Sequence, residues 1–409
     1  MTKFTVVIPT RERADTLSST LKTCVAQDYK NLTILVSDNC STDSTPEIVS
    51  GFKDERITYI RPAQRLSMSE HWDFALGHVD GGYVCIIGDD DGLAPNALEH
   101  VDAIIRETGT LSVSSKDKAI YFWPGYLEEK RKGLLQLSLN NTYRMADTAA
   151  CMEKSRRAML PLDLPQLYHG FVDISFLKSI TGSGGAVFKG SIPDIYSSVL
   201  LGISLKEHVL SNYPFTIHGL SHHSIGTSFF NKKLNAEAAE KFIRENKALS
   251  HPKMVICGST KAIFADMLLH AHDHHPGSPE PDMKKVIEAC MADATGNKSE
   301  DVYQEIRIAM EETARINGLD HFLKEVLKKY PYISQSPESG IITGYSQAQE
   351  MLYLPTLEWN VKDVSGAFHF MRHLLSKQPV NNKFSVPPIT IPDFLKRKVS
   401  HYLRRISGK

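Results

Sequence analysis

Four short apolar runs, separated by stretches with helical spacing, constrain the fold of this chain more than any other feature. The runs cover residues 4–9, 32–37, 57–60 and 83–87. They are continuous and rich in β-branched residues, as strands covered on both faces must be. Strands that alternate with helices predict βα units on a mainly parallel sheet. We therefore expect an α/β fold with helices on both faces of the sheet.

The rest of the chain has a different pattern. Short strand and helix signals interrupted by prolines occupy residues 111–235, and long helical patterns follow at 236–249, 283–291, 299–316 and 321–328. We predict a first domain over 1–235, divided near residue 110, and a mainly helical accessory region over 236–409. The last residues segregate apolar and basic side chains at helical spacing, which fits an anionic membrane surface and a domain-packing helix equally well.

The overall composition excludes several classes. The 47 Lys and Arg residues balance 47 Asp and Glu residues, so no general attraction to nucleic acid is expected. The six cysteines are scattered without a CxxC pair, as is typical of free thiols in a reducing compartment. No apolar run approaches the ~20 residues of a membrane span, and the N-terminus has no signal-peptide pattern. We expect a cytoplasmic protein, with peripheral contact at the inner face of the plasma membrane left open by the basic tail.

Polar residues follow each predicted strand. The candidate binding residues are Pro9, Thr10, Arg11 and Glu12 after the first strand, Asp38 and Asn39 after the second, Arg65 after the third, and Asp89, Asp90 and Asp91 after the fourth. The carboxyl ends of parallel strands meet at one edge of the sheet, where ligands of open α/β sheets bind. Loops at this edge are usually polar, so any one of these groups alone is unremarkable.

The three consecutive carboxylates of Asp89, Asp90 and Asp91 are the most informative group. They repel one another unless a cation or hydrogen-bond donors compensate their charge. Mg²⁺ or Mn²⁺, with substrate phosphates completing the coordination shell, is the natural partner. The alternative is a solvated acidic turn before a helix that opens at Pro95.

Together these motifs resemble the nucleotide-sugar-binding half of family 2 glycosyltransferases, which have the GT-A fold. The resemblance rests on a V-I-P-T step at 7–10, a V-x-D-x-x-S-x-D pattern at 36–43, and the aspartates followed by Leu93 and Pro95. It covers residues 3–110 well and 110–230 loosely. The chain departs from the family at Gly88, where the commonest D-x-D-D pattern has its first aspartate, and at 65–72, where an Asn/Gly-rich stretch is usual.

The resemblance implies a metal-dependent, inverting transfer of a hexosyl or N-acetylhexosaminyl group from a UDP-sugar. The acceptor would be a hydroxyl of a glycan or lipid-linked glycan, in bacterial surface polysaccharide synthesis. Asp38 would accept a hydrogen bond from the uracil ring, and the loop at 10–12 would flank the base. Asp89 would bind the ribose, and Asp90 or Asp91 would hold Mn²⁺ or Mg²⁺ on the diphosphate.

Inversion also requires a general base for the attacking hydroxyl. The resemblance places an acid about 100 residues after the metal motif, at the start of a helix, and Asp194 fits this position. A first-turn acid that stabilises the helix is the alternative explanation. Asp173 is the reserve candidate.

A histidine often completes the metal or diphosphate site in GT-A enzymes, and His218, His222 and His223 occupy the corresponding segment. We take His222 and His223 as the metal ligands, against the alternative of surface or packed histidines. The four histidines at 270–275 precede Pro276, where a helix end that favours cations explains them better than a second metal site.

Three other classes were weighed. A Rossmann dehydrogenase requires G-x-G-x-x-G after the first strand, and residues 9–13 contain no glycine. A nucleotidyltransferase normally has a glycine-rich loop at the same place, and this loop is absent here as well. A sugar-nucleotide-binding or glycan-binding protein of GT-A fold without transferase activity remains the non-enzyme alternative. The sequence leaves open whether the chain forms a homo-oligomer.

Overall fold

The computed structural model describes residues 1–116, 118–181, 186–190, 192–223, 250–275, 277–297, 299–334, 343–346 and 349–375. The helix predicted at 236–249 and the basic C-terminal tail lie outside these residues.

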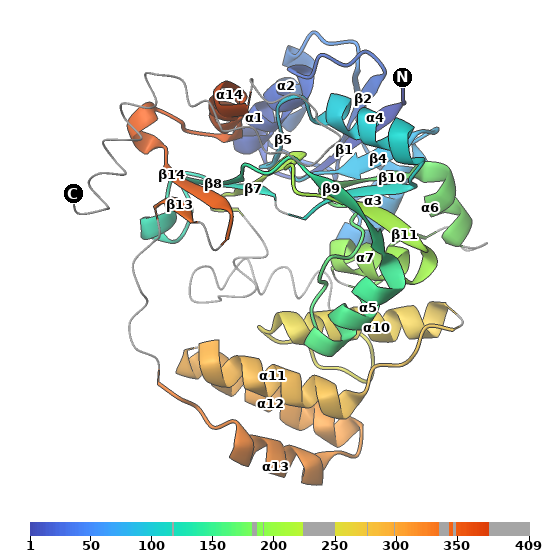
Figure 1. The fold of residues 1–409 in the computed structure, drawn as a ribbon, viewed down its shortest axis with the longest axis vertical. Helices are drawn as coiled ribbons and strands as arrows, with labels where there is room; N and C mark the ends of the chain where they lie inside the picture. The colour runs from blue at the N-terminus through green and yellow to red at the C-terminus, as the bar shows by residue number, and fades with distance from the viewer. Residues whose placement is uncertain are drawn as a thin grey trace.

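A sheet of eight strands forms the centre of the N-terminal half (Figure 1). Its order is β3 (Ile57–Ile60), β2 (Leu32–Asp38), β1 (Phe4–Thr10), β4 (Tyr83–Ile86), β10 (Gly170–Asp173), β6 (Ser112–Ser115), β11 (Glu207–Ser211) and β9 (Tyr143–Asp147). The first four are the predicted strands, and they pair in parallel. The α/β fold with a mainly parallel sheet is thereby confirmed.

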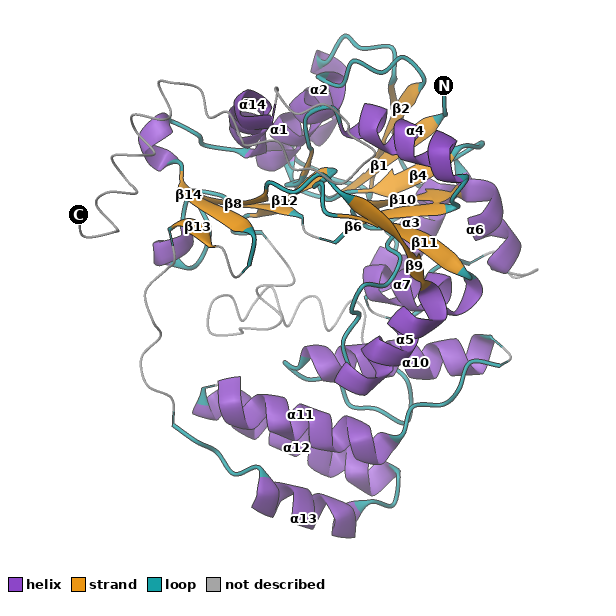
Figure 2. Ribbon diagram, in the orientation of Figure 1, coloured by secondary structure: helices purple, strands orange, loops and turns teal. Residues whose placement is uncertain are grey.

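Helices cover both faces of this sheet (Figure 2). Successive side chains of β1 point to opposite faces, so each face has apolar side chains to bury. Val6 and Ile8 pack into one core, together with α1 (Ala14–Val25) and α4 (Ala97–Thr108). Val7 packs into the opposite core with α3 (Met68–Gly77) and α7 (Pro193–Ser204). The remaining helices of this half are α2 (Thr45–Gly51), α5 (Thr148–Ala158), α6 (Ile174–Ile180) and the short η1 (Glu129–Arg131).

Helix α4 begins two residues later than predicted. Pro95 precedes the helix instead of opening it, because Asn96 adopts a left-handed backbone conformation with φ of 55° and forms the N-cap. Asparagine tolerates this conformation better than most residues. The turn after the three aspartates is thus longer than the sequence pattern indicates.

A second, six-stranded sheet lies beside the first. Its order is β13 (Gly344–Ser346), β14 (Met351–Pro355), β8 (Leu134–Ser138), β7 (Ala119–Phe122), β12 (Thr216–Leu220) and β5 (Gly92–Leu93). Strand β5 directly follows Asp91, and it pairs with β12. This pairing brings the segment around His218 next to the aspartates.

The helical region below the sheets in Figure 1 contains α10 (Thr260–His274), α11 (Met283–Asn297), α12 (Glu300–Ile316) and α13 (Asp320–Lys329). The last three match predicted helical patterns. Helix α10 packs against α7, and the core of this region is continuous with the core beneath the first sheet. None of the described helices is long and apolar enough to cross a membrane.

Beyond the helices, the chain returns to the N-terminal half. Strand β14 pairs with β8, and η4 (Leu357–Trp359) leads to α14 (Val364–Leu375), which packs against α1, β5 and β12. Figure 1 shows β14 and α14, in orange and red, beside the blue and teal elements of the N-terminal half. Residues 344–375, which we expected in the helical accessory region, therefore share the sheet and core of the first domain.

Candidate active site

The carboxyl ends of β1, β2 and β4 meet at one edge of the first sheet. Thr10 pairs with Asp38 in the register of β1 and β2. Strand β4 ends at Ile86, and Asp89 follows three residues later. Thr10, Asp38 and Asp91 are buried, while Asp89 and Asp90 are partly exposed. The predicted edge is thus where these side chains gather.

Asp38 is fully buried and held by three donors. Its Oδ1 accepts from the Ser41 backbone N–H at 2.9 Å, and its Oδ2 accepts from the Tyr59 hydroxyl at 2.5 Å and from Arg61 Nη1 at 3.2 Å. Burial and the nearby carboxylate raise the pKa of Tyr59 to about 12, so the phenol keeps its proton and donates. Neither Tyr59 nor Arg61 belongs to a recognised motif, so the sequence does not single them out as partners of Asp38.

Glu12 and Asn39 fasten neighbouring loops together. Glu12 Oε1 accepts from the Thr42 N–H at 2.8 Å, and Glu12 itself has a left-handed backbone with φ of 54°. The Asn39 side chain exchanges two hydrogen bonds of 2.9 Å with the backbone of Leu66. These two predicted binding residues therefore position the loops, while Arg65 is exposed beside Leu66. Arg11 is partly exposed, and its charge contributes to lowering the pKa of the buried His71.

Asp91 is an internal acceptor of the turn. Its Oδ2 accepts from the Gly88 N–H and from the Tyr168 hydroxyl, both at 2.6 Å, and its Oδ1 accepts from the Gly219 N–H at 2.7 Å. Burial raises its pKa to about 6 in spite of these donors. Like Asp38, this side chain has no exposed surface, and its three hydrogen bonds tie the turn to Tyr168 and to β12.

Asp89 and Asp90 are the more accessible members of the triplet. Asp89 Oδ1 lies 3.7 Å from Arg13 Nε, and Asp90 Oδ2 accepts from the Ser221 hydroxyl at 2.6 Å. Burial raises the pKa of Asp89 to about 7, against the opposing effect of Arg13, and it raises the pKa of Asp90 as well. Carboxylates whose charge is this unfavourable gain most from a bound cation.

The residues around the triplet fit a divalent metal ion. Ligand atoms of Asp91, His169 and His218 lie within 4.8 Å of one another. His169 Nε2 is buried without a hydrogen bond and lies 3.3 Å from Asp91 Oδ2. Burial lowers the pKa of His218 to about 4 and that of His169 well below its usual value, so both imidazoles are neutral, as metal ligands must be.

The two histidines expected as ligands gather beside Asp15, and the ligand atoms of these three side chains lie within 4.8 Å of one another, so they form a second group that could hold a metal ion. His223 Nε2 and His222 Nε2 lie 3.0 Å and 3.7 Å from Asp15 Oδ2, in the first turn of α1. Their segment is linked to the triplet through Arg13, whose Nη2 donates to the His223 carbonyl at 3.0 Å and whose Nε lies 3.7 Å from Asp89 Oδ1. The structure thus brings His218 to the aspartates and places His222 and His223 beside Asp15.

Asp194 lies in the first turn of α7 and interacts electrostatically with Lys118. Burial raises the pKa of Asp194, and the Lys118 ammonium opposes this. Lys118 also interacts with Asp91, and its Nζ lies 6.0 Å from the ring centroid of Tyr168. Asp194 therefore shares one charged neighbourhood with the aspartate turn, although the two are about 100 residues apart in sequence.

Asp173 lies away from this group. It pairs with Tyr83 at the start of β4, and its Oδ1 accepts from the Phe176 N–H at 2.8 Å as the N-cap of α6. The aspartate triplet follows the other end of β4, so the structure does not bring the reserve base candidate to the site.

Comparison with known proteins agrees with this arrangement. Residues 5–149 match the family described as "Glycosyl transferase family 2". This part of the chain is a family 2 glycosyltransferase domain. The domain contains Thr10, Asp38, Lys118 and the aspartate triplet, and the family resemblance noted in the sequence is confirmed.

The names of two curated relatives of the family 2 domain describe enzymes that act on lipid-linked glycans. A GalNAc(5)-diNAcBac-PP-undecaprenol beta-1,3-glucosyltransferase of Campylobacter jejuni is 33% identical over 136 residues, which are 29% of this chain and 44% of the relative. WfaP of Escherichia coli, a UDP-Glc:alpha-D-GlcNAc-diphosphoundecaprenol beta-1,3-glucosyltransferase, is 30% identical over 91 residues, or 22% of this chain and 36% of the relative. The chain thus spans less than half the length of these relatives.

Among solved structures, Staphylococcus aureus TarS 1–349 in complex with UDP-GlcNAc aligns with 80% of this chain and 91% of its own, at 14% identity and a TM-score of 0.45.

Proposed function

We propose that this chain is an inverting glycosyltransferase that moves a hexosyl or N-acetylhexosaminyl group from a UDP-sugar to a hydroxyl of a glycan or lipid-linked glycan. The observation that carries the proposal is that Lys118 interacts with both Asp91 of the aspartate turn and Asp194, in a chain whose residues 5–149 match family 2. The names of the relatives support a role in bacterial surface polysaccharide synthesis. Because undecaprenol is a membrane lipid, we place the reaction at the inner face of the plasma membrane.

On the donor side, Asp38 is the acceptor we propose for the uracil N–H, because three donors already fix the position of its carboxylate. Pro9, Thr10 and Arg11 would flank the base. Asp89 would accept from the ribose hydroxyls, since it is partly exposed at the end of the adjacent strand.

For the metal, Mn²⁺ or Mg²⁺, we favour Asp90 and His218 as the residues that hold it. The Ser221 hydroxyl, which donates to Asp90, directly follows β12, the strand that contains His218. Asp91 fixes the turn through its three donors, and His169, whose Nε2 lies 3.3 Å from Asp91 Oδ2, is a further candidate ligand. When bound, such an ion supplies charge neutralisation for the departing nucleoside diphosphate.

Asp194 is the proposed general base. Burial raises its pKa and so makes it a stronger proton acceptor than a solvated aspartate, while the Lys118 ammonium opposes this rise and favours the ionised form that accepts a proton. The acceptor hydroxyl would lose its proton to this carboxylate as the oxygen attacks the anomeric carbon.

Hydrolysis of a panel of UDP-sugars with Mn²⁺ tests the proposal. We expect slow release of UDP that chelation abolishes, and Asp194→Asn to abolish transfer to an acceptor while UDP affinity stays within a few-fold. Absence of nucleotide-sugar binding by calorimetry, with and without metal, would overturn the assignment. Binding without turnover for any donor and acceptor would instead favour the non-transferase alternative.

A further inference from the structure

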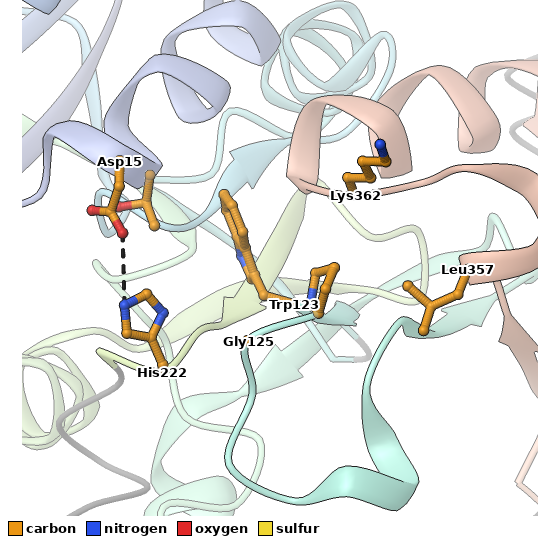
Figure 3. A pocket seen from close by; sticks show the side chains of 8 residues that line it. Asp15, Trp123, Gly125, His222, Leu357 and Lys362 are labelled. Atoms are coloured by element: carbon orange, nitrogen blue, oxygen red, sulfur yellow. Dashed lines mark ion pairs between the residues drawn. The ribbon is translucent and has the colours of Figure 1, made fainter.

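A hollow beside the aspartate turn has no part in the proposed reaction. It has a volume of about 450 Å³ and lies between α1, the β7–β8 connection and the start of α14 (Figure 3). Trp123, Pro124 and Leu357 form apolar walls, and Asp15, His222 and Lys362 supply polar groups. We call this the outer hollow. Its volume falls within the roughly 300–1,000 Å³ that small-molecule sites usually have.

The chemistry of the walls matches a sugar ring better than a phosphate. A pyranose has apolar C–H faces and hydroxyl groups around its edge, so it suits apolar walls with a few hydrogen-bonding groups. One carboxylate, one imidazole and one ammonium group around the outer hollow leave no excess of positive charge. An anionic ligand would therefore be repelled by Asp15 as much as it is attracted by Lys362, and would gain little from charge.

The polar groups are available to a ligand. Asp15 and His222 keep about half of their side-chain surface exposed, at 52% and 49%. Figure 3 shows their side chains directed toward each other on one side of the hollow, across from Leu357 and Lys362. Lys362 is exposed, and its ammonium forms no hydrogen bond or ion pair with the residues that the structure describes.

The outer hollow is connected to the aspartate turn through short contacts. The indole N–H of Trp123 donates to the Asp90 carbonyl at 3.0 Å. On the side of Asp15, His223 bonds Asp15 through its ring and accepts from Arg13 through its carbonyl, and Arg13 reaches Asp89. A sugar in the hollow would therefore lie one side chain away from the turn.

We propose that the outer hollow binds a neutral sugar unit. Its role as a subsite for a distal unit of the acceptor glycan rests on the proposed glycosyltransferase function. Leu357 and Lys362, on the wall opposite Asp15 and His222, come from the segment that returns after the helical region.

Saturation-transfer NMR on the full chain, without metal or nucleotide, tests the binding. The probes are the methyl β-glycosides of glucose, galactose, N-acetylglucosamine and N-acetylgalactosamine, each at up to about 50 mM, since single sugars bind in the millimolar range of affinity. We expect transfer to the ring C–H protons of at least one glycoside. No transfer to any of the four would overturn the proposal.

Gly125→Leu tests whether the saturation-transfer signal comes from a sugar bound in the outer hollow. A Cβ at residue 125 would lie 3.2 Å from His222 Nδ1, so the new side chain fills the space between them. We expect binding to weaken about tenfold or more. Gly51→Leu, at an exposed glycine with nothing within 4 Å of its Cβ, is the matched control and should bind as the wild type does.

Asp15→Asn is the second variant, in case Gly125→Leu fails to fold. It preserves shape and removes the charge, and weaker binding with an unchanged melting temperature is expected. Equal glycoside affinity in a folded Gly125→Leu, or in Asp15→Asn if only that variant folds, would overturn the proposal. UDP-sugar hydrolysis is measured in parallel. Glycoside binding without hydrolysis would contradict the proposed function alone, and hydrolysis without glycoside binding would contradict the outer hollow alone.

Discussion

Asp90 and Asp91 are adjacent in the chain, yet their surroundings differ. Asp91 accepts three short hydrogen bonds, from the buried Gly219 N–H and from the partly buried Gly88 N–H and Tyr168 hydroxyl, whereas Asp90 has a partly exposed carboxylate bonded to Ser221. A buried donor without an acceptor costs about 1–3 kcal/mol. The two aspartates should therefore respond differently to substitution.

We predict that Asp91→Ala lowers the free energy of unfolding by about 3 kcal/mol, because it leaves one buried and two partly buried donors without an acceptor. Asp90→Ala should change it by less than about 1 kcal/mol and abolish metal-dependent UDP release. Urea unfolding and the hydrolysis assay measure the two effects. Equal destabilisation by both substitutions would contradict the distinction.

Lys118 gives a prediction about pH. Its charge favours the ionised form of Asp194, so Lys118→Met should raise the pKa of Asp194 further. Less of the base is then ionised near neutral pH, and the acid limb of the pH–rate profile moves to higher pH. Lys118→Arg keeps the charge and should restore the wild-type profile. Transfer rates between about pH 5 and 9 give the profile, and an acid limb that stays in place in Lys118→Met would exclude this role.

At the scale of the element, helix α10 contains a buried aspartate, Asp266, whose ionisation lowers the stability of the fold. Asp266 is fully buried, its Oδ1 accepts from the His251 N–H at 2.8 Å, and its Oδ2 has no hydrogen bond. Burial raises its pKa to about 7, well above the value of about 3.9 for an unfolded chain. Between these two values the native state binds a proton that the unfolded state lacks, so stability falls as pH rises from about 4 to about 7.

We predict that Asp266→Asn stabilises the protein at pH 8 by up to about 4 kcal/mol, as a shift of roughly three pKa units implies, and leaves stability near pH 4 unchanged. Urea unfolding at both pH values measures this. Asp273→Asn is the control on the same helix. The hydrogen bond from His251 lowers the pKa of Asp273, so its loss should not stabilise the protein. The same gain at pH 4 and pH 8 for Asp266→Asn would contradict the titration.

The elements that the sequence predicted well are those with a strong local pattern. The continuous apolar runs located β1 to β4 within one residue at each end. Strands such as β10 and β6 have four residues each, and their pairing partners are distant in sequence, so no local pattern reveals them. The left-handed backbone of His169, with φ of 66°, accompanies a buried imidazole that no spacing rule could place.

The residues of the candidate site divide in the same way, into those with a local sequence pattern and those placed by tertiary packing. Asp38 and the aspartate triplet could be predicted because each directly follows a strand of one parallel sheet. Lys118, Tyr168 and His169 reach the site only through β-sheet pairing and tertiary packing, and none belongs to a family motif. The pairing of β12 with β5 favours His218 over His222 and His223 as a ligand near the aspartate triplet. This pairing cannot be read from the local sequence.

At the scale of the whole molecule, the N-terminal domain is completed by the end of the described chain. Val364, Phe368 and Met371 of α14 are buried in the same core as Leu17 and Leu21 of α1. The stability of the domain should therefore depend on residues far from it in sequence.

We predict that Phe368→Ala, at a side chain only 2% exposed, lowers the free energy of unfolding by about 3–5 kcal/mol. It should also speed proteolysis of the N-terminal half. His369→Ala, on the exposed side of the same helix, should be neutral within about 0.5 kcal/mol. If Phe368→Ala leaves the N-terminal half as resistant to protease as the wild type, α14 does not support that core.

The late arrival of α14 has a consequence for synthesis. Roughly 340 residues separate α1 from α14, so on a ribosome that adds about 5–20 residues per second the apolar side of α1 waits roughly 17–70 s for its cover. The helices of α10 to α13 emerge during that interval and can fold first. A nascent chain stalled before residue 364 should therefore recruit chaperones through its oldest segment rather than its newest.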